Sequence, residues 1–330
     1  MNRFAPSSAL RRAAMAALAF ACALGAGPLA AQEYPSRPIK LVVPFSAGAT
    51  ADTLARMIAK DMQAELGQSV VVENRAGGGS TIGAAAVARS APDGYTLLLG
   101  SGSTHTVAPV VIKDMMYDPV KDFAPVSLIG TTSYVLVTNP KLPAKTLAEL
   151  VEYGKAHPQA LSYGSTGLGG AVHLATVMLE SLSGARFLHV PYRGGAPAIA
   201  DLLAGQIDFS LTTAENAGMI DTGKLRALAV LGPDRLSPLP AVPTCIEAGV
   251  PGCSFPVWNA VFAPAGTPPA IVERLTRVVE HALAQPATVQ RLRELGYQPG
   301  SGGPAALARR VVEEGAFMRK TAAAAGVQPQ

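Results

Sequence analysis

The chain has 330 residues and a formal net charge of +4; 49% of its residues are hydrophobic and 15% are charged. Three of the 27 basic residues and none of the 23 acidic ones lie before residue 32, so the rest of the chain holds 24 basic and 23 acidic residues. Such a nearly neutral chain lacks the basic footprint of a nucleic-acid-binding protein. At roughly 100–200 residues per domain, the length predicts two lobes.

The first 31 residues predict a secretory signal peptide. A basic start with three arginines precedes an apolar, alanine-rich run over residues 13–30, and no acidic residue occurs before Glu33. We expect cleavage after Ala31, with Ala30 as the alternative site, and export to the periplasm. No later segment has about 18 uninterrupted apolar residues, so no membrane span is expected after the signal peptide.

Strand-like and helix-like runs alternate along the rest of the chain. Short apolar runs, typical of strands covered on both faces, predict strands at residues 39–45, 70–73, 96–99, 134–138, 161–164, 187–191, 207–211 and 225–231. Apolar residues at helical spacing predict helices at residues 52–67, 146–157, 171–182, 196–204, 268–284 and 304–323. We expect Asp52 to cap the first helix and Gly67 to end it. The alternation predicts α/β lobes with largely parallel sheets.

Two segments are candidates for the connections between the lobes, namely residues 129–133 and the chain near Val230. If the chain crosses at both, lobe 1 comprises residues 32–132 and 231–330, and lobe 2 comprises residues 133–230. A cleft between two such lobes is a common place for a small-molecule site.

Two cysteines follow the signal peptide, Cys245 and Cys253, within "PTCIEAGVPGCSFP". Export would place them in an oxidising compartment, and the glycines and proline between them allow the chain to bend back. We expect a disulfide, with two small buried thiols as the alternative. A zinc site is not expected, because no His lies near either cysteine.

Four loops rich in small residues follow predicted strands, at residues 46–50, 100–105, 164–173 and 192–198. Open α/β sheets bind ligands beyond the carboxyl ends of their strands. Small side chains let a ligand approach the backbone, and a helix start exposes unpaired N–H groups. The loops together therefore predict a site for a small anion held by amides and hydroxyls, although any one of them taken alone is more often only a tight turn.

The candidate ligand contacts all lie in or beside these loops. They are Phe45, Ser46, Ala47, Gly48 and Thr50; Ser101, Ser103, Thr104 and His105; Ser165, Thr166, Gly167, Gly169 and His173; and Tyr192, Arg193 and Gly194. Arg193 would clamp a carboxylate with two hydrogen bonds, and Trp258 would form a wall of the cleft. The histidines have a structural alternative, as do Phe45 and Arg193.

The chain lacks the sequence signatures of several enzyme classes. It contains no G-x-S-x-G nucleophile motif, no phosphate-loop motif and no H-E-x-x-H metal motif. We therefore expect no cofactor, no metal and no enzymatic activity. The alternatives are an exported hydrolase that uses Ser101 or Ser165 as its nucleophile, and a ligand-sensing partner of a signalling protein.

Several segments carry a family resemblance, among them "LVVPFSAGATADTLARMIA", "VPYRGGAPAIADLLAGQIDF" and "FAPAGTPPAIVERL". From about Tyr34 to about Gly296 the chain resembles the Bug family, the periplasmic solute-binding receptors of tripartite tricarboxylate transporters. The family commonly has paired glycines in the first loop, whereas this chain has Gly48 followed by Ala49.

The resemblance implies a periplasmic-binding-protein type II fold, in which two α/β lobes joined by a hinge of two crossings close on a ligand. It also implies a function. The protein would be a monomer that captures a small organic carboxylate and delivers it to integral-membrane transporter subunits.

Overall fold

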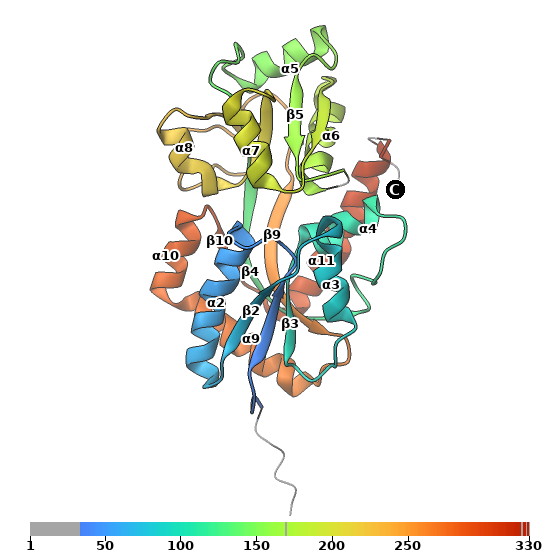
Figure 1. The fold of residues 1–330 in the computed structure, drawn as a ribbon, viewed down its shortest axis with the longest axis vertical. Coiled ribbons are helices and arrows are strands. Elements are labelled where there is room, and N and C mark those ends of the chain that lie inside the picture. Colours follow the sequence, from blue (N-terminus) through green and yellow to red (C-terminus); the bar gives the residue numbers. More distant parts are fainter. Residues whose placement is uncertain (1–33, 169, 325, 328, 330) are drawn as a thin grey trace, which may run out of the picture. The chain divides into compact units, whose positions relative to one another are not determined.

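The computed structural model describes residues 34–168, 170–324, 326–327 and 329; the expected signal peptide at residues 1–31 lies outside them. The chain divides into Met1–Ser36 and a large unit, Arg37–Gln330, which contains two α/β lobes (Figure 1). Within the described residues, no helix is long and apolar enough to cross a membrane.

The sheet of lobe 1 contains both parallel and antiparallel strands. In spatial order it consists of β2 (Val70–Asn74), β1 (Ile39–Val43), β3 (Thr96–Ser101), β9 (Pro256–Pro264), β4 (Phe123–Thr138) and β10 (Gln298–Pro299). The first three strands run parallel, whereas β9 runs antiparallel to both of its neighbours. The side chains of β1 are buried apart from the partly buried Lys40, as expected of a strand with helices on both faces.

The sheet of lobe 2 shares one strand with lobe 1. It consists of β6 (Leu188–Pro191), β5 (Ser162–Ser165), β7 (Phe209–Thr212), the second half of β4, and β8 (Arg226–Leu231). Strands β5, β6 and β7 run parallel, so their carboxyl ends lie at one edge. Strand β4 is antiparallel to β7 and to β8.

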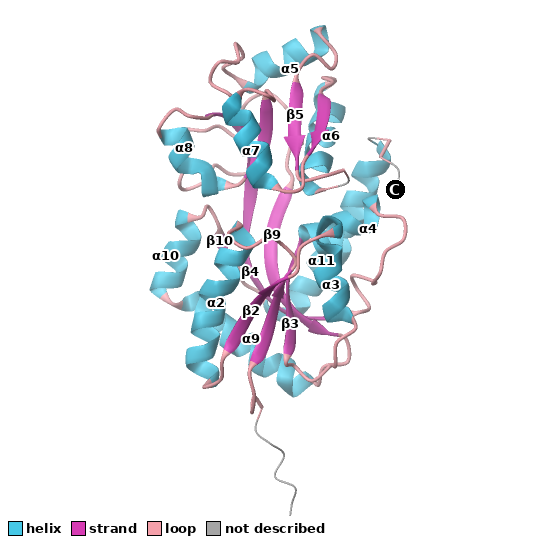
Figure 2. Cartoon of the chain, viewed as in Figure 1, coloured by secondary structure: helices cyan, strands magenta, loops and turns pink. Residues whose placement is uncertain are grey.

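Helices flank both sheets (Figure 2). They are α2 (Thr50–Leu66), η1 (Gly78–Ser80), α3 (Thr81–Ala88), η2 (Ser103–Val107), α4 (Ala108–Val111), α5 (Leu147–Ala156), α6 (Ala171–Ser183), α7 (Gly195–Ala204), η3 (Ala214–Asn216), α8 (Ala217–Asp221), α9 (Pro269–Ala284), α10 (Pro286–Glu294) and α11 (Gly303–Ala324). In α2, Leu54, Ile58 and Met62 recur at helical spacing and are fully buried. Gly67 ends this helix in the left-handed conformation, where its amide donates to Gln63.

Strand β4 connects the lobes without a break. Its residues 123–133 pair with β9, and its residues 134–138 pair with β7 and β8. The first predicted crossing, at residues 129–133, therefore falls inside a strand.

The chain that follows β8 stays attached to β8. The amide of Cys245 donates to the carbonyl of Val230 at 2.8 Å, and the amide of Phe255 donates to that of Leu231 at 3.1 Å. We therefore propose a return crossing at Phe255–Pro256 in place of Val230. The limits of the two lobes remain a prediction.

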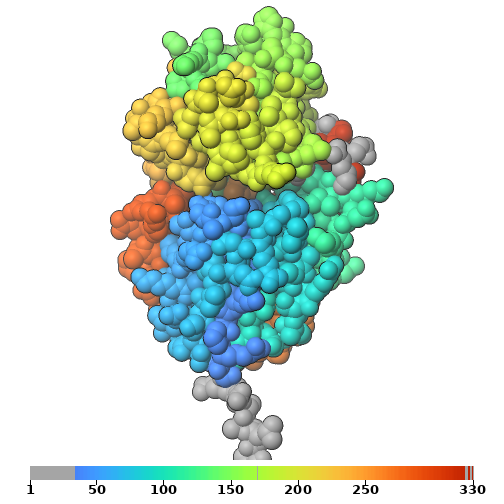
Figure 3. Space-filling view, in the orientation of Figure 1, coloured from blue at the N-terminus to red at the C-terminus, as the bar shows by residue number. Residues whose placement is uncertain are grey.

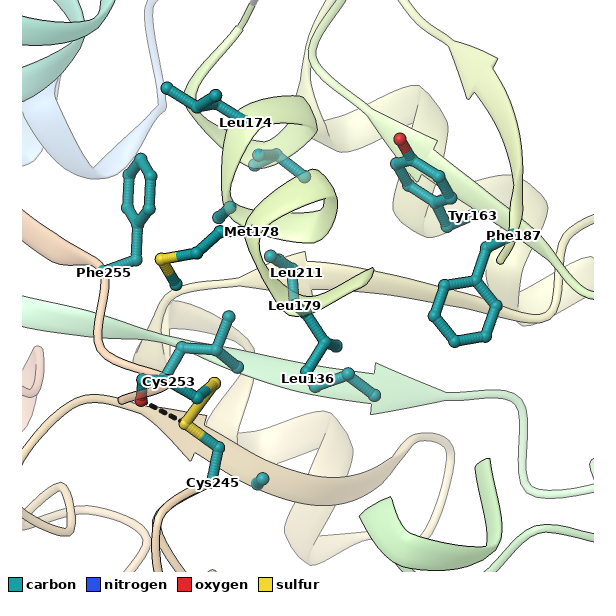
Figure 4. Close-up of a cluster of buried hydrophobic side chains, with 14 of the residues drawn as sticks. Leu136, Tyr163, Leu174, Met178, Leu179, Phe187, Leu211, Cys245, Cys253 and Phe255 are labelled. Atoms are coloured by element: carbon teal, nitrogen blue, oxygen red, sulfur yellow. Dashed lines mark hydrogen bonds between the residues drawn. A yellow bond between two sulfur atoms is a disulfide. The ribbon is translucent and has the colours of Figure 1, made fainter. Parts of the chain in front are cut away.

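One apolar cluster includes side chains from both lobes. Val107 and Met318, on η2 and α11, belong to the same buried cluster as Leu174 and Met178 of α6. Phe255 also belongs to this cluster, as do Cys245 and Cys253, which a disulfide joins (Figure 4). Both cysteines are fully buried.

The disulfide should contribute to stability, because it closes a short loop and so reduces the entropy of the unfolded chain. We expect the double variant Cys245→Ala/Cys253→Ala to lose about 2–3 kcal/mol of unfolding free energy, measured by urea denaturation. Reductant should destabilise the wild-type protein in the same way and leave the double variant unchanged. A wild-type midpoint that does not respond to reductant would contradict this expectation.

Candidate functional site

The predicted loops lie at sheet edges that face each other. The first two follow the parallel strands β1 and β3, and the other two follow β5 and β6. The two lobes touch at the start of α2, where the Thr50 hydroxyl lies 3.4 Å from that of Thr213 and donates to Glu215. Figure 3 shows the blue surface of lobe 1 meeting the yellow surface of lobe 2 along a narrow seam.

The loop at residues 46–50 supplies fewer open amides than its composition suggests. Ser46, Ala47 and Gly48 are exposed, and Phe45 is partly exposed. The Gly48 amide, however, donates to Asp52 at 3.0 Å, and the Ala49 amide donates to Ser46 at 3.3 Å. Among the described residues, the amides of Ser46 and Ala47 have no partner.

Asp52 does not cap α2 in the expected way. Ala49 is the N-cap, and Asp52, in the first turn, reaches back from inside the helix to Gly48. Arg56 and Asn74 also donate to its carboxylate, each at 3.0 Å. Burial raises the pKa of Asp52, but these hydrogen bonds outweigh it, so the pKa lies below its ordinary value. The carboxylate is thus an ionised structural group that holds the loop.

The loop at residues 100–105 mostly faces the core. His105 is 1% exposed, stacks on Phe262 with ring centroids 3.9 Å apart, and accepts or donates a 2.8 Å hydrogen bond with Thr104. Burial lowers the pKa of His105 to about 3, so the ring is neutral. His105 and Thr104 therefore pack in the core of lobe 1. Ser103 is partly exposed.

Ser101 differs from the rest of its loop. Its hydroxyl is buried and has no hydrogen-bond partner in the described part of the chain. Ser101 lies opposite Asn259 in the β3–β9 pairing, so the two side chains point to the same face of the sheet. An unpaired buried hydroxyl costs about 1–3 kcal/mol, which makes Ser101 a strong candidate for a ligand contact.

Trp258 lies in the core and does not form a wall of the site. It is fully buried, and its indole N–H donates to Glu314 at 2.7 Å. Because Trp258 precedes Asn259 in β9, its side chain points to the opposite face of the sheet.

The third loop is fixed by a serine–histidine pair. Ser165 is 1% exposed, and its hydroxyl lies 2.6 Å from Nε2 of His189 and accepts from the Gly167 amide at 3.1 Å. His189 stacks on His173, with ring centroids 4.2 Å apart. Burial lowers the pKa of His189 to about 4, and the charge of His173 adds to this shift, so His189 is neutral near pH 7. Thr166 is exposed, and Gly169 lies outside the described residues.

The fourth loop leaves a helix start open. The Tyr192 hydroxyl is already paired, since it donates to Asp201 at 2.7 Å. Arg193 is exposed and has no ion pair or hydrogen bond with the described residues. A Cβ added at Gly194 or Gly195 would meet no atom within 4 Å, so the first amides of α7 are accessible to a ligand.

Sequence patterns missed two further loops at the same edges. Thr213 and Glu215 follow β7, and both lie next to Thr50 of lobe 1. In the sequence, Glu215 cannot be told apart from an ordinary acidic residue on the surface. The glycine run before Ser80 follows β2, and all four residues from Gly77 to Ser80 have positive φ. The signal that identified the other loops, a position directly after a strand, applies equally to both.

Two cavities in the described part of the chain lie away from these loops. One of about 310 Å³ is lined mainly by α11, including Arg310 and Glu314, and another of about 680 Å³ lies between Pro238 and α10. Neither includes a predicted contact. No cluster of His, Cys, Asp and Glu among the described residues is suited to a metal ion.

The neutral state of His189 gives a pH prediction. His189 binds a proton near pH 6.5 in the unfolded chain but only near pH 4 in the folded protein. The unfolding free energy therefore decreases as the pH falls from 6.5 to 4. In urea denaturation at stepped pH, His189→Gln should lose less unfolding free energy than the wild type between pH 7 and pH 5. An identical loss in both proteins would contradict a neutral His189.

Comparisons with known proteins agree on one family. Residues 54–321 match the tripartite tricarboxylate transporter family receptor. Protein BugT of Bordetella pertussis is 42% identical over 279 residues, which cover 83% of this chain and 85% of BugT.

Three solved structures share the fold along most of the chain. Rpa4515 of R. palustris with adipate has a TM-score of 0.86 at 37% identity, covering 90% of this chain and 100% of that one. The periplasmic binding protein BugD has a TM-score of 0.83 at 36% identity, with the same coverage. MatC of Rhodopseudomonas palustris with bound malate has a TM-score of 0.82 at 34% identity, covering 87% of this chain and 99% of that one. The chain therefore belongs to the Bug family of tripartite tricarboxylate transporter receptors, as its sequence predicts, and has their two-lobed α/β fold.

Proposed function

We propose that this protein is a periplasmic receptor that binds a small organic carboxylate between its lobes and delivers it to a tripartite tricarboxylate-type transporter in the membrane. The observation that carries the proposal is the convergence of strand-to-helix loops from both lobes, which touch where Thr50 meets Thr213. The signal peptide expected at residues 1–31 supports export.

The open groups in these loops suit an anion that has several oxygens. Within the described residues, the donors without a partner are the amides of Ser46 and Ala47, the first amides of α7 and the Ser101 hydroxyl. Hydrogen bonds to a charged group contribute about 1.5–3 kcal/mol each. Four of them give about 6–12 kcal/mol, a range that includes the roughly 8 kcal/mol of micromolar binding. A carboxylate therefore needs no lysine here, and the exposed Arg193 is available as an additional clamp.

The relatives support the same class of ligand. The structure of Rpa4515 is that with adipate and the structure of MatC is that with bound malate, and both compounds are small organic carboxylates. Their sequences are 37% and 34% identical to this one.

An anion site must distinguish an acid from its neutral amide. We expect titration calorimetry to show micromolar or tighter binding of at least one of adipate, malate and succinate, and at least 10-fold weaker binding of the corresponding diamide. Equal affinities for acid and amide would refute an anion site, because an amide lacks the charge that these donors complement.

Ser101→Ala should separate binding from stability. The variant removes a buried hydroxyl that has no partner in this structure, so the unfolding free energy should stay the same or rise by up to about 1 kcal/mol. The affinity for the carboxylate should fall about 5- to 20-fold, because the hydroxyl gains its partner only from the ligand. Calorimetry and urea denaturation measure the two effects.

Ser90→Ala is the matched control for Ser101→Ala. The Ser90 hydroxyl donates to Ala86 at 2.8 Å, outside the predicted loops. This control should lose some stability and keep its affinity. Loss of stability without loss of affinity in Ser101→Ala would show that Ser101 is structural.

The contact between Ser165 and His189 is the feature that a hydrolase would use, and it is within hydrogen-bond reach. Three observations argue against catalysis. Ser165 is buried, its hydroxyl is also bonded to the Gly167 backbone, and no carboxylate among the described residues bonds to His189. The pair instead holds the third loop in place, as a binding protein requires.

A further inference from the structure

Glu215 is an acidic residue at the same sheet edges as the unpartnered hydrogen-bond donors of the candidate loops. It lies in η3, directly after β7 of lobe 2, and its carboxylate accepts a hydrogen bond from the Thr50 hydroxyl of lobe 1. Thr213, from the same turn, lies 3.4 Å from Thr50. Glu215 therefore stands at the contact between the lobes, beside the first turn of α2.

Glu215 also lies close to the polar residues at the base of the site. Its charge contributes to the raised pKa values of Tyr134 and Tyr297, after burial, which is the larger cause. The Tyr297 hydroxyl donates to Asn259 at 2.9 Å, and Asn259 pairs with Ser101 across β3 and β9. A ligand that reaches the unpartnered Ser101 hydroxyl thus lies in the same region as Glu215.

No basic side chain in the described residues neutralises Glu215. Its carboxylate interacts with the hydroxyls of Thr50 and Thr213 and with the Thr50 backbone, and desolvation raises its pKa. The residue as a whole is still exposed, so this desolvation is partial and a ligand can reach the carboxyl group. The carboxylate is therefore an acceptor with no cationic partner in the part of the chain that the structure describes.

We propose that Glu215 determines ligand specificity, so that the site prefers a carboxylate that also carries a hydrogen-bond donor, an ammonium or a hydroxyl group, over one with a second carboxylate in that position. This inference rests on the proposed function, and it defines the class of carboxylate more narrowly.

The physical basis is a pair of opposite effects at one position. A ligand ammonium or hydroxyl next to Glu215 gains an attractive hydrogen bond, whereas a ligand carboxylate in the same place is repelled by like charge. Both effects increase the difference in binding free energy between the two kinds of ligand, and this difference is the specificity of the site. Partial exclusion of water around Glu215 strengthens both.

The test compares pairs of ligands that differ by a single group. Adipate and 5-aminopentanoate have the same four-methylene spacer, and the second replaces one carboxylate with an ammonium group; succinate and malate differ by one hydroxyl. Calorimetry on the wild-type protein should show at least 10-fold tighter binding of 5-aminopentanoate than of adipate, and tighter binding of malate than of succinate. In Glu215→Gln, the first ratio should fall at least 10-fold, which equals about 1.4 kcal/mol.

The matched control is Glu152→Gln, the same substitution on α5 of the same lobe. Glu152 is exposed and pairs with Lys155 on the surface, and Figure 1 shows α5 at the end of lobe 2 away from lobe 1. This control should keep both ligand ratios of the wild type. It also removes the same unit of charge, so a general effect of net charge would appear in it as well.

Every outcome decides the proposal. If Glu215→Gln changes the affinities of all four ligands by the same factor, in either direction, Glu215 acts on lobe closure or competes with the ligand, and the specificity inference is wrong. Equal binding of adipate and 5-aminopentanoate to the wild type overturns it too, while leaving carboxylate binding intact. If none of the four compounds binds, the proposed function itself loses its support, and this inference falls with it.

Discussion

Strand β4 belongs to both sheets, and this shared strand constrains everything else in the structure. Its first half pairs with β9 in lobe 1, and its second half pairs with β7 and β8 in lobe 2. Because the backbone hydrogen bonds continue along one strand, the two sheets cannot be placed independently of each other. The loop after β1 consequently meets the turn after β7, where Thr50 contacts Thr213 and Glu215.

Much of the architecture was predictable, because it depends on local pattern. Apolar runs identified the parallel strands, and helical spacing identified α2 and its end at Gly67. Strand β9 was missed because prolines bound it and Asn259 interrupts its apolar run. The first half of β4 was missed for a similar reason, because it contains Pro125 and pairs irregularly with β9.

The positions of the candidate loops were predictable, but their contacts were not, and their role in binding stays a prediction. Placement after a strand correctly located the loops, since that rule depends only on topology. Which amides are open depends on tertiary contacts: Asp52 occupies the Gly48 amide, and His105 is packed on Phe262. The contact between Thr50 and Glu215 joins residues 165 positions apart, so no local pattern indicates it. Conversely, the disulfide was expected from compartment and loop composition, and the structure contains that bond.

The apolar cluster that contains the disulfide also limits how the two halves can separate. Parting them at Val107 and Met318 would expose hydrocarbon to water, at a cost of about 25 cal/mol for each Å². Parting them at Thr50 breaks hydrogen bonds that water replaces at little net cost. Entry of a solute is therefore easiest from the α2 side. The residues that an incoming molecule meets first are Thr50 and Glu215.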